Sequence, residues 1–393
     1  MKRKNILYDG GSLWSLKNAT GIHILEIIEN LSENNHIILL SHHLDILSMK
    51  HNENITVEFI RTFSKSFIKH LTYDLISLLV LLIKYPKGKI DVLYSRNRTG
   101  FALIFYSKLL NIPLFLEING ILKQETKTRN ESFFKVFYMT RIMEPLNFKN
   151  AKKLIAVSNS VKKGLINQYN INSNKITVIE NGANTELFKP MPKKYEMLKE
   201  HDSKLNDSFN YIGFIGSFTK WHGLESLVKS IPYVIKENKR TRFIFVGDGP
   251  NKNHIKELVD TLKIKKYVIF TGQIPYSDVP DYINLFDVGV ILKIKNVPGS
   301  PLKLWEYLSS GKPVIASKTE DFKIIQKNKL GILVDPNNPK EIANAIINLL
   351  ENDDLRCEMG KEAINYVKNS HTWKYVSDEL DELFKIVINE FKC

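Results

Sequence analysis

Short apolar runs alternate with amphipathic stretches along almost the whole of this 393-residue chain. In the first half, the runs typical of strands cover residues 5–8, 36–40, 56–60, 92–94, 113–117, 153–157 and 177–179. In the second half, they cover residues 211–215, 242–246, 268–271, 288–291, 314–316 and 331–334. Helical periodicity marks stretches between them, including 21–32, 67–84, 224–236, 253–262, 279–285 and 340–352. Strands that alternate with helices form parallel sheets covered on both faces, so the pattern predicts an α/β protein with doubly wound parallel sheets.

A polar segment with two prolines, residues 190–210, separates the two halves. The length suits two or three domains at about 150 residues each. We therefore predict a first domain over residues 1–188, a second over residues 189–372, and a final helix over residues 373–393 that crosses back to the first. In such folds ligands bind beyond the carboxyl ends of the strands, and here we expect them in a cleft between the domains.

Cysteine content and hydropathy exclude several classes of protein. Only two cysteines occur, Cys357 and Cys393, so the chain is neither a disulfide scaffold nor a cysteine-based zinc protein. The longest strongly apolar stretch, residues 75–83, is too short to span a bilayer, which needs about 20 residues in a helix. The basic N-terminus has too short an apolar run for a signal peptide, so we expect a cytoplasmic protein.

Lysine and arginine outnumber aspartate and glutamate by 56 to 42, which gives a formal net charge of +14. Such an excess favours anionic partners, such as phosphorylated ligands or an acidic membrane face. A composition rich in lysine and asparagine explains the charge equally well. Nucleic acid is the weakest candidate, because the sequence has no arginine-rich arm, zinc-finger spacing or RNP-like aromatic strand.

A glycine-rich turn follows the first predicted strand and contains Gly10 and Gly11. Glycines there let backbone N–H groups approach a phosphate or a sugar closely, and the N-terminus of the helix after Thr20-Gly21 adds positive potential. The spacing is not G-x-G-x-x-G, so it does not indicate a dinucleotide site. A tight structural turn is the alternative.

A second segment, residues 214–224, joins the first strand of the second half to a helix. Ser217, Lys220 and His222 offer a hydroxyl, an ammonium and an imidazole that suit a diphosphate. By itself, Lys220 is more typical of a surface lysine. The turn at residues 246–250 is also glycine-rich, but such corners are common between strand and helix.

A third segment, residues 298–308, predicts a short helix bracketed by Pro301 and Gly311. The free N–H groups around Ser300 to Lys303 would point at an anion, and Glu306 follows about one turn later. A carboxylate there is able to accept both hydroxyls of a ribose. The alternative is a capped helix with a solvated glutamate.

In this order, these segments resemble the retaining glycosyltransferases of family 4, which have the GT-B fold of two Rossmann-like domains facing a cleft. The resemblance covers nearly the whole chain. Residues 153–162 and 176–190 are similar to the end of the family's first domain. Its most specific part is the Ser-Pro-Leu-Lys-Leu-Trp-Glu-Tyr run, residues 300–307, with Gly-Lys-Pro-Val-Ile-Ala-Ser at residues 311–317.

The resemblance implies transfer of a sugar from a nucleotide-diphosphate donor to an acceptor, with retention and usually without a metal. The first domain would bind the acceptor and the second the donor. Glu306 would bind the ribose, Gly272 to Ile274 the base, and residues 9–12 would close over the donor. The residues implied around the diphosphate or the donor sugar are Ser300, Pro301, Leu302 and Lys303. Dipoles and cations, including Lys220 and His222, would stabilise the leaving group.

Three departures from the family pattern bear on the site. Common members have Arg and Lys where this chain has Ser217 and His222. Pro298 stands where the first of two glutamates is usual, and Asn119 stands where a histidine-bearing motif is usual. Glu117 and Asn119 are then the candidates for positioning the acceptor hydroxyl or stabilising the reaction centre; a structural role at the strand end is the alternative.

Acceptor-binding residues would lie in the first domain. Residues 63–89 combine apolar side chains, among them Phe67, Ile68 and Leu71, with basic ones. The basic residues of this stretch are Lys65, Lys69, His70, Lys84, Lys87 and Lys89. Such a face is typical of a helix that rests on an anionic membrane, although a helix that covers a sheet looks similar. Residues 120–137, with Lys123, Lys127, Arg129 and Lys135, are a second candidate for an acceptor loop.

We therefore expect a nucleotide-sugar-dependent hexosyltransferase of surface polysaccharide or glycolipid synthesis, without a resident cofactor or metal. Its partners would be a nucleotide sugar, a glycan or lipid-linked acceptor, and an anionic surface such as the inner face of the cell membrane. Two alternatives stay open: a nucleotide-sugar 2-epimerase, and a non-catalytic subunit with the GT-B fold.

Overall fold

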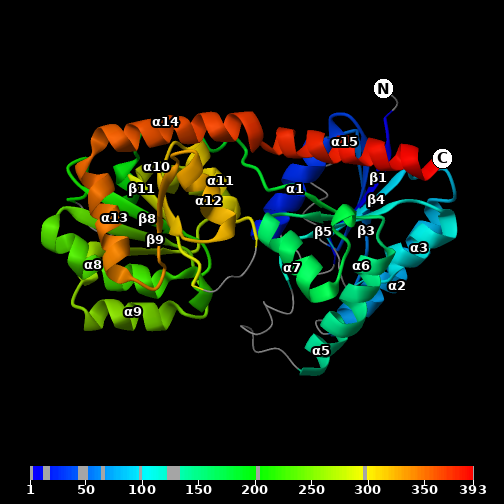
Figure 1. Ribbon diagram of the computed structural model, residues 1–393, viewed down its shortest axis with the longest axis horizontal. Helices are drawn as coiled ribbons and strands as arrows, with labels where there is room; N and C mark the ends of the chain where they lie inside the picture. The colour runs from blue at the N-terminus through cyan, green and yellow to red at the C-terminus, as the bar shows by residue number, and fades with distance from the viewer. Residues whose placement is uncertain are drawn as a thin grey trace. The chain divides into compact units, whose positions relative to one another are not determined.

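The computed structural model describes residues 3–11, 18–42, 52–62, 67–96, 100–121, 133–200, 204–294 and 299–392. The chain forms two compact units. Unit 1 comprises Met1–Asn181, Pro298–Ser300 and Trp373–Cys393, and unit 2 comprises Gly182–Val297 and Pro301–Thr372. Each unit is built on one parallel sheet with helices on both faces (Figure 1), which confirms the predicted α/β class.

The sheet of unit 1 has seven parallel strands in the order β3-β2-β1-β4-β5-β6-β7. They are β1 (Asn5–Asp9), β2 (His36–Ser41), β3 (Ile55–Phe59), β4 (Val92–Ser95), β5 (Leu114–Ile118), β6 (Lys153–Ala156) and β7 (Ile176–Val178). Each strand overlaps a predicted run. Because the strand order reverses between β1 and β4, the carboxyl ends of these two strands form the switch point at which doubly wound folds bind ligands.

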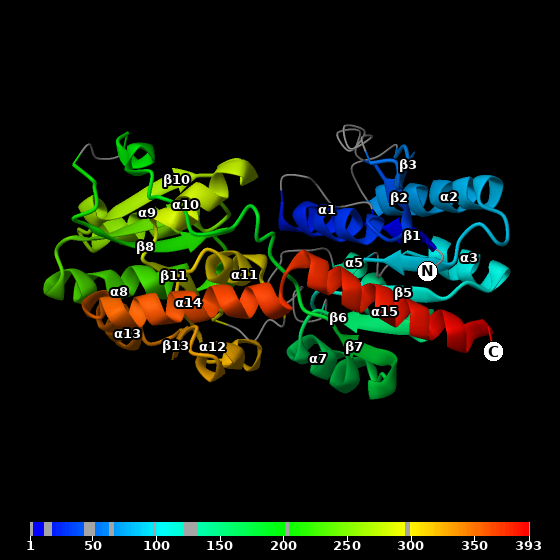
Figure 2. The same ribbon diagram turned by 90° about the horizontal axis from the view of Figure 1, so that it is seen from above.

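The helices of unit 1 lie beside this sheet (Figure 2), and side chains of α2, α3, α6 and α7 share an apolar core with its strands. They are α1 (Ala19–Ser32), α2 (Phe67–Lys84), α3 (Ala102–Leu110), α5 (Phe133–Tyr138), the π-helix Met139–Met143, α6 (Glu144–Asn150), α7 (Asn159–Tyr169) and α15 (Trp373–Lys392). Asparagine and serine side chains cap two of them: Asn18 accepts from the Gly21 N–H at the start of α1, and Ser158 from that of Val161 at the start of α7.

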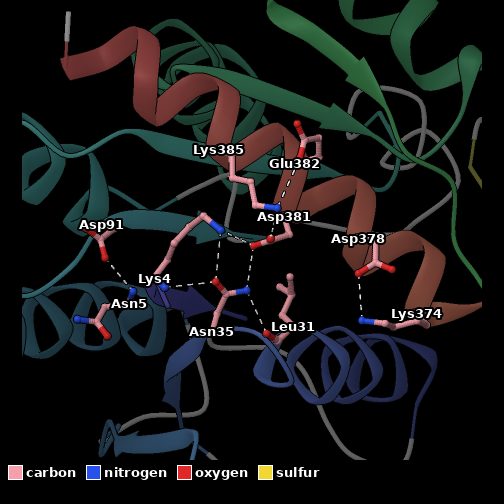
Figure 3. A network of polar contacts seen from close by, with 10 residues as sticks. All are labelled: Lys4, Asn5, Leu31, Asn35, Asp91, Lys374, Asp378, Asp381, Glu382 and Lys385. Atoms are coloured by element: carbon pink, nitrogen blue, oxygen red, sulfur yellow. Dashed lines mark hydrogen bonds and ion pairs between the residues drawn. The ribbon is translucent and has the colours of Figure 1, made fainter. Parts of the chain in front are cut away.

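Helix α15 belongs to unit 1 and packs on α1 (Figure 1). The ring of Phe384 lies against the sheet, with its centroid 4.7 Å from that of Phe115. Asp381 accepts hydrogen bonds from Lys4 at 2.7 Å and Asn35 at 2.9 Å, and pairs with Lys385 at 3.0 Å (Figure 3). These contacts attach the end of the chain to its beginning.

The sheet of unit 2 has six parallel strands in the order β10-β9-β8-β11-β12-β13. They are β8 (Asn210–Ile215), β9 (Thr241–Val246), β10 (Val268–Gly272), β11 (Val288–Ile291), β12 (Val314–Ser317) and β13 (Gly331–Val334). The helices are α8 (Leu224–Glu237), α9 (Lys252–Thr261), α10 (Val279–Leu285), α11 (Leu302–Ser309), α12 (Lys323–Lys327), α13 (Pro339–Glu351) and α14 (Asp353–Ser370). The switch point of this sheet lies at the carboxyl ends of β8 and β11.

Alternate residues of the strands face two apolar cores in unit 2. Phe243 and Phe245 of β9 pack with α8, α9 and α13, whereas Ile244 and Val246 pack with α10 and α11 on the other face. This burial on both faces explains why the strands read as continuous apolar runs.

Several residues singled out from the sequence lie outside the described residues. They are Ser12, Lys65, Lys123, Lys127, Arg129 and Pro298, together with the side chains of Phe67, Ile68 and Lys135. Within the described ranges, no helix is both long and apolar enough to cross a membrane.

Candidate functional site

Glycines bring three loops of unit 2 together at the carboxyl edge of its sheet. Gly216 follows β8 with φ of 137°, and Gly247 follows β9 with φ of 126°. The Gly247 N–H donates to the carbonyl of Gly272 at 2.8 Å. A Cβ atom at Gly247 would lie 2.2 Å from the Gly216 carbonyl oxygen, so only glycine permits this approach.

Lys303 extends from the first turn of α11 to the end of β8. Its Nζ donates to the carbonyl oxygen of Ile215 at 2.8 Å and lies 4.3 Å from the centroid of the Phe214 ring. Burial and the nearby Lys293 lower the pKa of Lys303 to about 7, although Glu306 acts in the opposite direction. Lys303 is therefore a cation whose charge an incoming anion would stabilise.

Glu306 lies one turn after Lys303 on the same helix and is 7% exposed. Its Oε1 accepts a hydrogen bond from the hydroxyl of Tyr276 at 3.1 Å. The carboxylate is thus oriented by a phenol that the sequence analysis did not identify. Tyr276 follows β10 in a 3-10 turn, Tyr276–Asp278, close to Gly272, whose φ is 74°.

The turn after β8 presents the three polar residues predicted there. Ser217 and Lys220 are exposed. The Nδ1 of His222 lies 2.5 Å from the carbonyl oxygen of Ser217, and burial, followed by the charge of Lys303, lowers the pKa of His222 to about 3. His222 is thus a neutral imidazole with Nδ1–H as donor, so the cations at this edge are lysines.

Helix α11 starts at Leu302, two residues after Ser300, the earliest residue whose N–H was predicted to point at an anion. Pro301 is the N-cap and has no N–H, so the first free helical donors are those of Leu302 and Lys303. Pro301 and Leu302 are half-buried. Ser300 belongs to unit 1, where its carbonyl oxygen accepts from the side chain of Asn181 at 2.6 Å.

In unit 1, the turn after β1 is held by Asp9. This buried carboxylate accepts the Gly11 N–H at 2.8 Å and the hydroxyl of Tyr73 at 2.7 Å. Gly11 has φ of 78°, and Gly10 is partly exposed. The turn therefore has a fixed shape at the switch point.

Glu117, at the end of β5, is 2% exposed and fully engaged. Its Oε1 lies 3.2 Å from both Arg96 Nε and His23 Nε2 and accepts from Asn119 Nδ2 at 2.8 Å, while Tyr94 donates to Oε2. Burial alone would raise the pKa of Glu117, but its charged and hydrogen-bonding neighbours hold it below the ordinary value. Burial, followed by Arg96, lowers the pKa of His23 to about 3, so the guanidinium carries the countercharge.

This geometry separates the roles of the two residues predicted at β5. Both carboxylate oxygens of Glu117 already accept hydrogen bonds, so its action on a substrate passes through its neighbours. Asn119 is half-buried and is oriented by Glu117. Arg96 and His23 were not among the residues predicted from the sequence; the position of Arg96 directly after β4 was the available signal.

The predicted site residues are divided between the two units. Unit 1 holds Gly10, Gly11, Glu117, Asn119 and Ser300; unit 2 holds Ser217, Lys220, His222, Gly272, Pro301, Leu302, Lys303 and Glu306. Lys293, which follows β11, is a further cation missed from the sequence. The described residues contain no cluster of three His, Cys, Asp or Glu that could hold a metal ion.

Known proteins resemble this chain in sequence and in fold. Residues 20–187 match the family model of Glycosyltransferase Family 4, and residues 197–366 match that of Glycosyl transferases group 1. An uncharacterised glycosyltransferase of Methanocaldococcus jannaschii is 27% identical over 278 residues, 69% of this chain and 67% of the relative. The UDP-Gal:alpha-D-GlcNAc-diphosphoundecaprenol alpha-1,3-galactosyltransferase of Escherichia coli is 24% identical over 346 residues, 86% of each chain.

Among solved structures, HepE of Anabaena in complex with UDP and glucose superposes with a TM-score of 0.78 and 18% identity. The superposition covers 98% of this chain and 100% of HepE, so the two proteins share a fold. The two family models together span most of the chain, one over each half. The chain therefore belongs to the group 1 glycosyltransferases of family 4 and has the GT-B fold.

Proposed function

We propose that this protein transfers a hexosyl group from a nucleotide-diphosphate sugar to a glycan or lipid-linked acceptor with retention of configuration. The observation that carries the proposal is the placement of Lys303 and Glu306 one turn apart on α11, with Lys303 Nζ at the end of β8. A switch point that presents a cation and a carboxylate one turn apart suits the diphosphate and the ribose of one ligand.

The chemistry needs a stabilised diphosphate leaving group. When the bond between the anomeric carbon and the diphosphate oxygen breaks, negative charge grows on that oxygen. Lys303 and the free N–H groups of Leu302 and Lys303 oppose this charge by electrostatics alone, without a resident cofactor or metal. Glu306, oriented by Tyr276, accepts the ribose hydroxyls.

Unit 1 contributes the acceptor side in this proposal. Asn119, held by the buried Glu117, offers an amide to the acceptor hydroxyl or to the sugar. Gly10 and Gly11 lie in a turn of fixed shape, in which the Gly11 N–H is already donated to Asp9, so Gly10 is the glycine that offers its backbone N–H. The E. coli relative, whose name gives a diphosphoundecaprenol-linked acceptor, supports a lipid-linked acceptor and a place in surface polysaccharide or glycolipid synthesis.

A thermal-shift screen against UDP-, GDP-, ADP- and dTDP-sugars tests the donor site. We expect one nucleotide to raise the melting temperature selectively, because a ligand that binds only the folded state stabilises it. Glu306→Ala and Lys303→Ala each remove a charge-assisted contact of about 1.5–3 kcal/mol, which weakens donor binding roughly ten- to a hundredfold. Glu237→Ala, an exposed glutamate at the end of α8, is the matched control.

Three outcomes would contradict the proposal. Wild-type donor affinity and transfer rate in both site variants would remove the assignment of Lys303 and Glu306. Absence of any nucleotide shift would favour a non-catalytic subunit. Donor turnover without an acceptor would favour a 2-epimerase.

We also propose that α2 and α3 rest on an anionic membrane that holds the acceptor. The two helices pack together and expose a row of large apolar side chains: Leu71, Leu75, Leu79, Leu82, Ile83, Phe105 and Leu109. Ile83 is 78% exposed and Leu79 is 58% exposed. Lys87, Lys89 and Lys108 are exposed beside or within these helices, and neither helix has an exposed carboxylate among its described side chains.

Flotation with vesicles of phosphatidylglycerol and phosphatidylcholine tests this surface. We expect binding to the anionic vesicles and a loss of at least about tenfold in the double variant Leu79→Gln, Ile83→Gln, since each burial contributes about 1–2 kcal/mol. Ile386→Gln, a comparably exposed residue of α15, is the control. Absence of binding at physiological salt would refute the proposal.

A further inference from the structure

Lys293 lies two residues after the end of β11. This strand pairs with β8 at the switch point of unit 2. Its backbone N–H donates to Ser317 Oγ at 2.7 Å, and the next N–H, of Ile294, donates to the carbonyl of Trp221 at 3.0 Å. A Cβ atom at Gly223 would lie 2.4 Å from Leu292 Cβ, so glycine permits the two loops to touch. Lys293 is thus fixed beside the turn that carries His222.

The side chain of Lys293 is 13% exposed, and Nζ lies 3.6 Å from Asp321 and 5.0 Å from the centroid of the Phe322 ring. Its charge acts on two other basic groups, since it contributes to the lowered pKa of both Lys303 and His222. Two lysines and an imidazole therefore converge at the ends of β8 and β11. Burial of like charges is unfavourable unless anions join them. Asp321 lies beside Lys293 and Glu306 acts on Lys303, yet the pKa of each lysine stays lowered, so a further anion would stabilise both charges.

We propose that Lys293 is a second cationic ligand of the donor diphosphate, next to Lys303. The inference rests on the proposed function and extends it to a residue on a different strand. His222 is neutral and Ser217 is uncharged, so a ligand with about two negative charges meets only lysines here. Lys303 lies on α11 and Lys293 follows β11, so the two cations come from different elements at the same switch point.

Binding of nucleoside diphosphates tests the inference. Calorimetric titration of the full chain with UDP, GDP, ADP and dTDP first identifies the one that binds the wild type. We expect Lys293→Met to weaken this nucleoside diphosphate about ten- to a hundredfold. We expect the matching nucleoside, which has no phosphate, to bind both proteins equally. Lys293→Arg keeps the charge and should retain binding within about threefold.

The matched control is Lys318→Met, an exposed lysine after β12 that pairs with Glu341. A second readout is the pH dependence of nucleotide-sugar binding, because the terminal phosphate of a free nucleoside diphosphate itself titrates near neutrality. Lys303 is faced by Lys293, by Glu306 and by His222, so loss of the Lys293 charge should move the decline of affinity to higher pH. Lys303 carries its charge at pH 6 in both proteins, so the loss of affinity at this pH reports the contact of Lys293 with the diphosphate, whereas a role through Lys303 alone would leave the affinity at pH 6 unchanged.

A third variant guards against misfolding of Lys293→Met. Asp321→Asn removes the carboxylate that competes for Lys293, so we expect nucleoside diphosphate to bind several-fold more tightly. The inference is overturned if Lys293→Met binds as the wild type, if it loses nucleoside and nucleoside diphosphate equally, or if Asp321→Asn binds more weakly. If no nucleoside diphosphate binds the wild type, the proposed function fails first and the inference fails with it.

Discussion

Donor affinity should fall as pH rises through the titration of Lys303. Burial and Lys293 lower the pKa of this residue to about 7 in the free protein. About 90% of the molecules then carry the charge at pH 6, about half at pH 7 and about 10% at pH 8. A bound diphosphate favours the charged form, so binding above pH 7 must take up a proton. The affinity should therefore fall by roughly tenfold per pH unit above pH 7.

Calorimetry with a nucleotide-diphosphate sugar measures this effect, since its diphosphate does not titrate in this range. Titrations in buffers of different ionisation enthalpy count the protons, and we expect about 0.9 proton taken up per donor at pH 8. His222 is neutral throughout, because its pKa is about 3. Burial also lowers the pKa of Lys312, to about 8. This lysine follows the C-terminal end of α11, whereas Lys303 lies in its first turn, and Lys312 donates there to the Asn284 carbonyl.

Lys303→Arg supplies the control, because a guanidinium stays charged over the whole range. Its donor affinity should be nearly independent of pH. The reasoning is refuted if the wild type takes up no proton at pH 8. It is also refuted if the decline of affinity persists in Lys303→Arg.

Three further perturbations have expected results. Asp381→Ala leaves Lys4 without its carboxylate (Figure 3) and should destabilise unit 1 by about 2–4 kcal/mol. We expect faster hydrogen exchange in α15, and unchanged exchange would contradict the prediction. Gly247→Ala forces a Cβ into a neighbouring carbonyl at positive φ and should cost about 1–3 kcal/mol in chemical denaturation, whereas an unchanged midpoint would show that the loops relax. Glu117→Gln leaves Arg96 without a countercharge and should lower kcat by at least about tenfold while nucleotide affinity stays constant; a change in affinity alone would count against this role.

Strands and helices were largely predictable because their signals are local. The runs at residues 288–291 and 331–334 coincide with β11 and β13, and the stretches 67–84 and 279–285 coincide with α2 and α10. Most positions of these strands are apolar, because helices cover both faces of each sheet, so the limits of the strands are clear. The alternation of strand and helix predicted the class of sheet, which is parallel and doubly wound, but not the order of its strands. That order depends on contacts between distant segments, such as those that place β1 and β8 beside their neighbours.

The candidate site was predictable where its residues lie on one segment. Lys303 and Glu306 are three residues apart on α11, so their common face follows from helical geometry. Gly10 and Gly11 were placed at the end of a strand because they directly follow the apolar run of residues 5–8 and Asp9. In contrast, Tyr276 reaches Glu306 from a different element, and no spacing in the sequence relates the two.

The sequence by itself determined the fold class, the glycine turns and the residues of α11, because hydrophobic periodicity and the effects of glycine and proline act over a few neighbouring positions. Only the tertiary structure decided the charge states: His222 is neutral, Lys303 titrates near neutrality, and Glu117 is locked against Arg96. These states depend on loss of water and on charges from remote strands. Both arise when the sheet assembles, and neither is encoded by neighbouring residues in the chain.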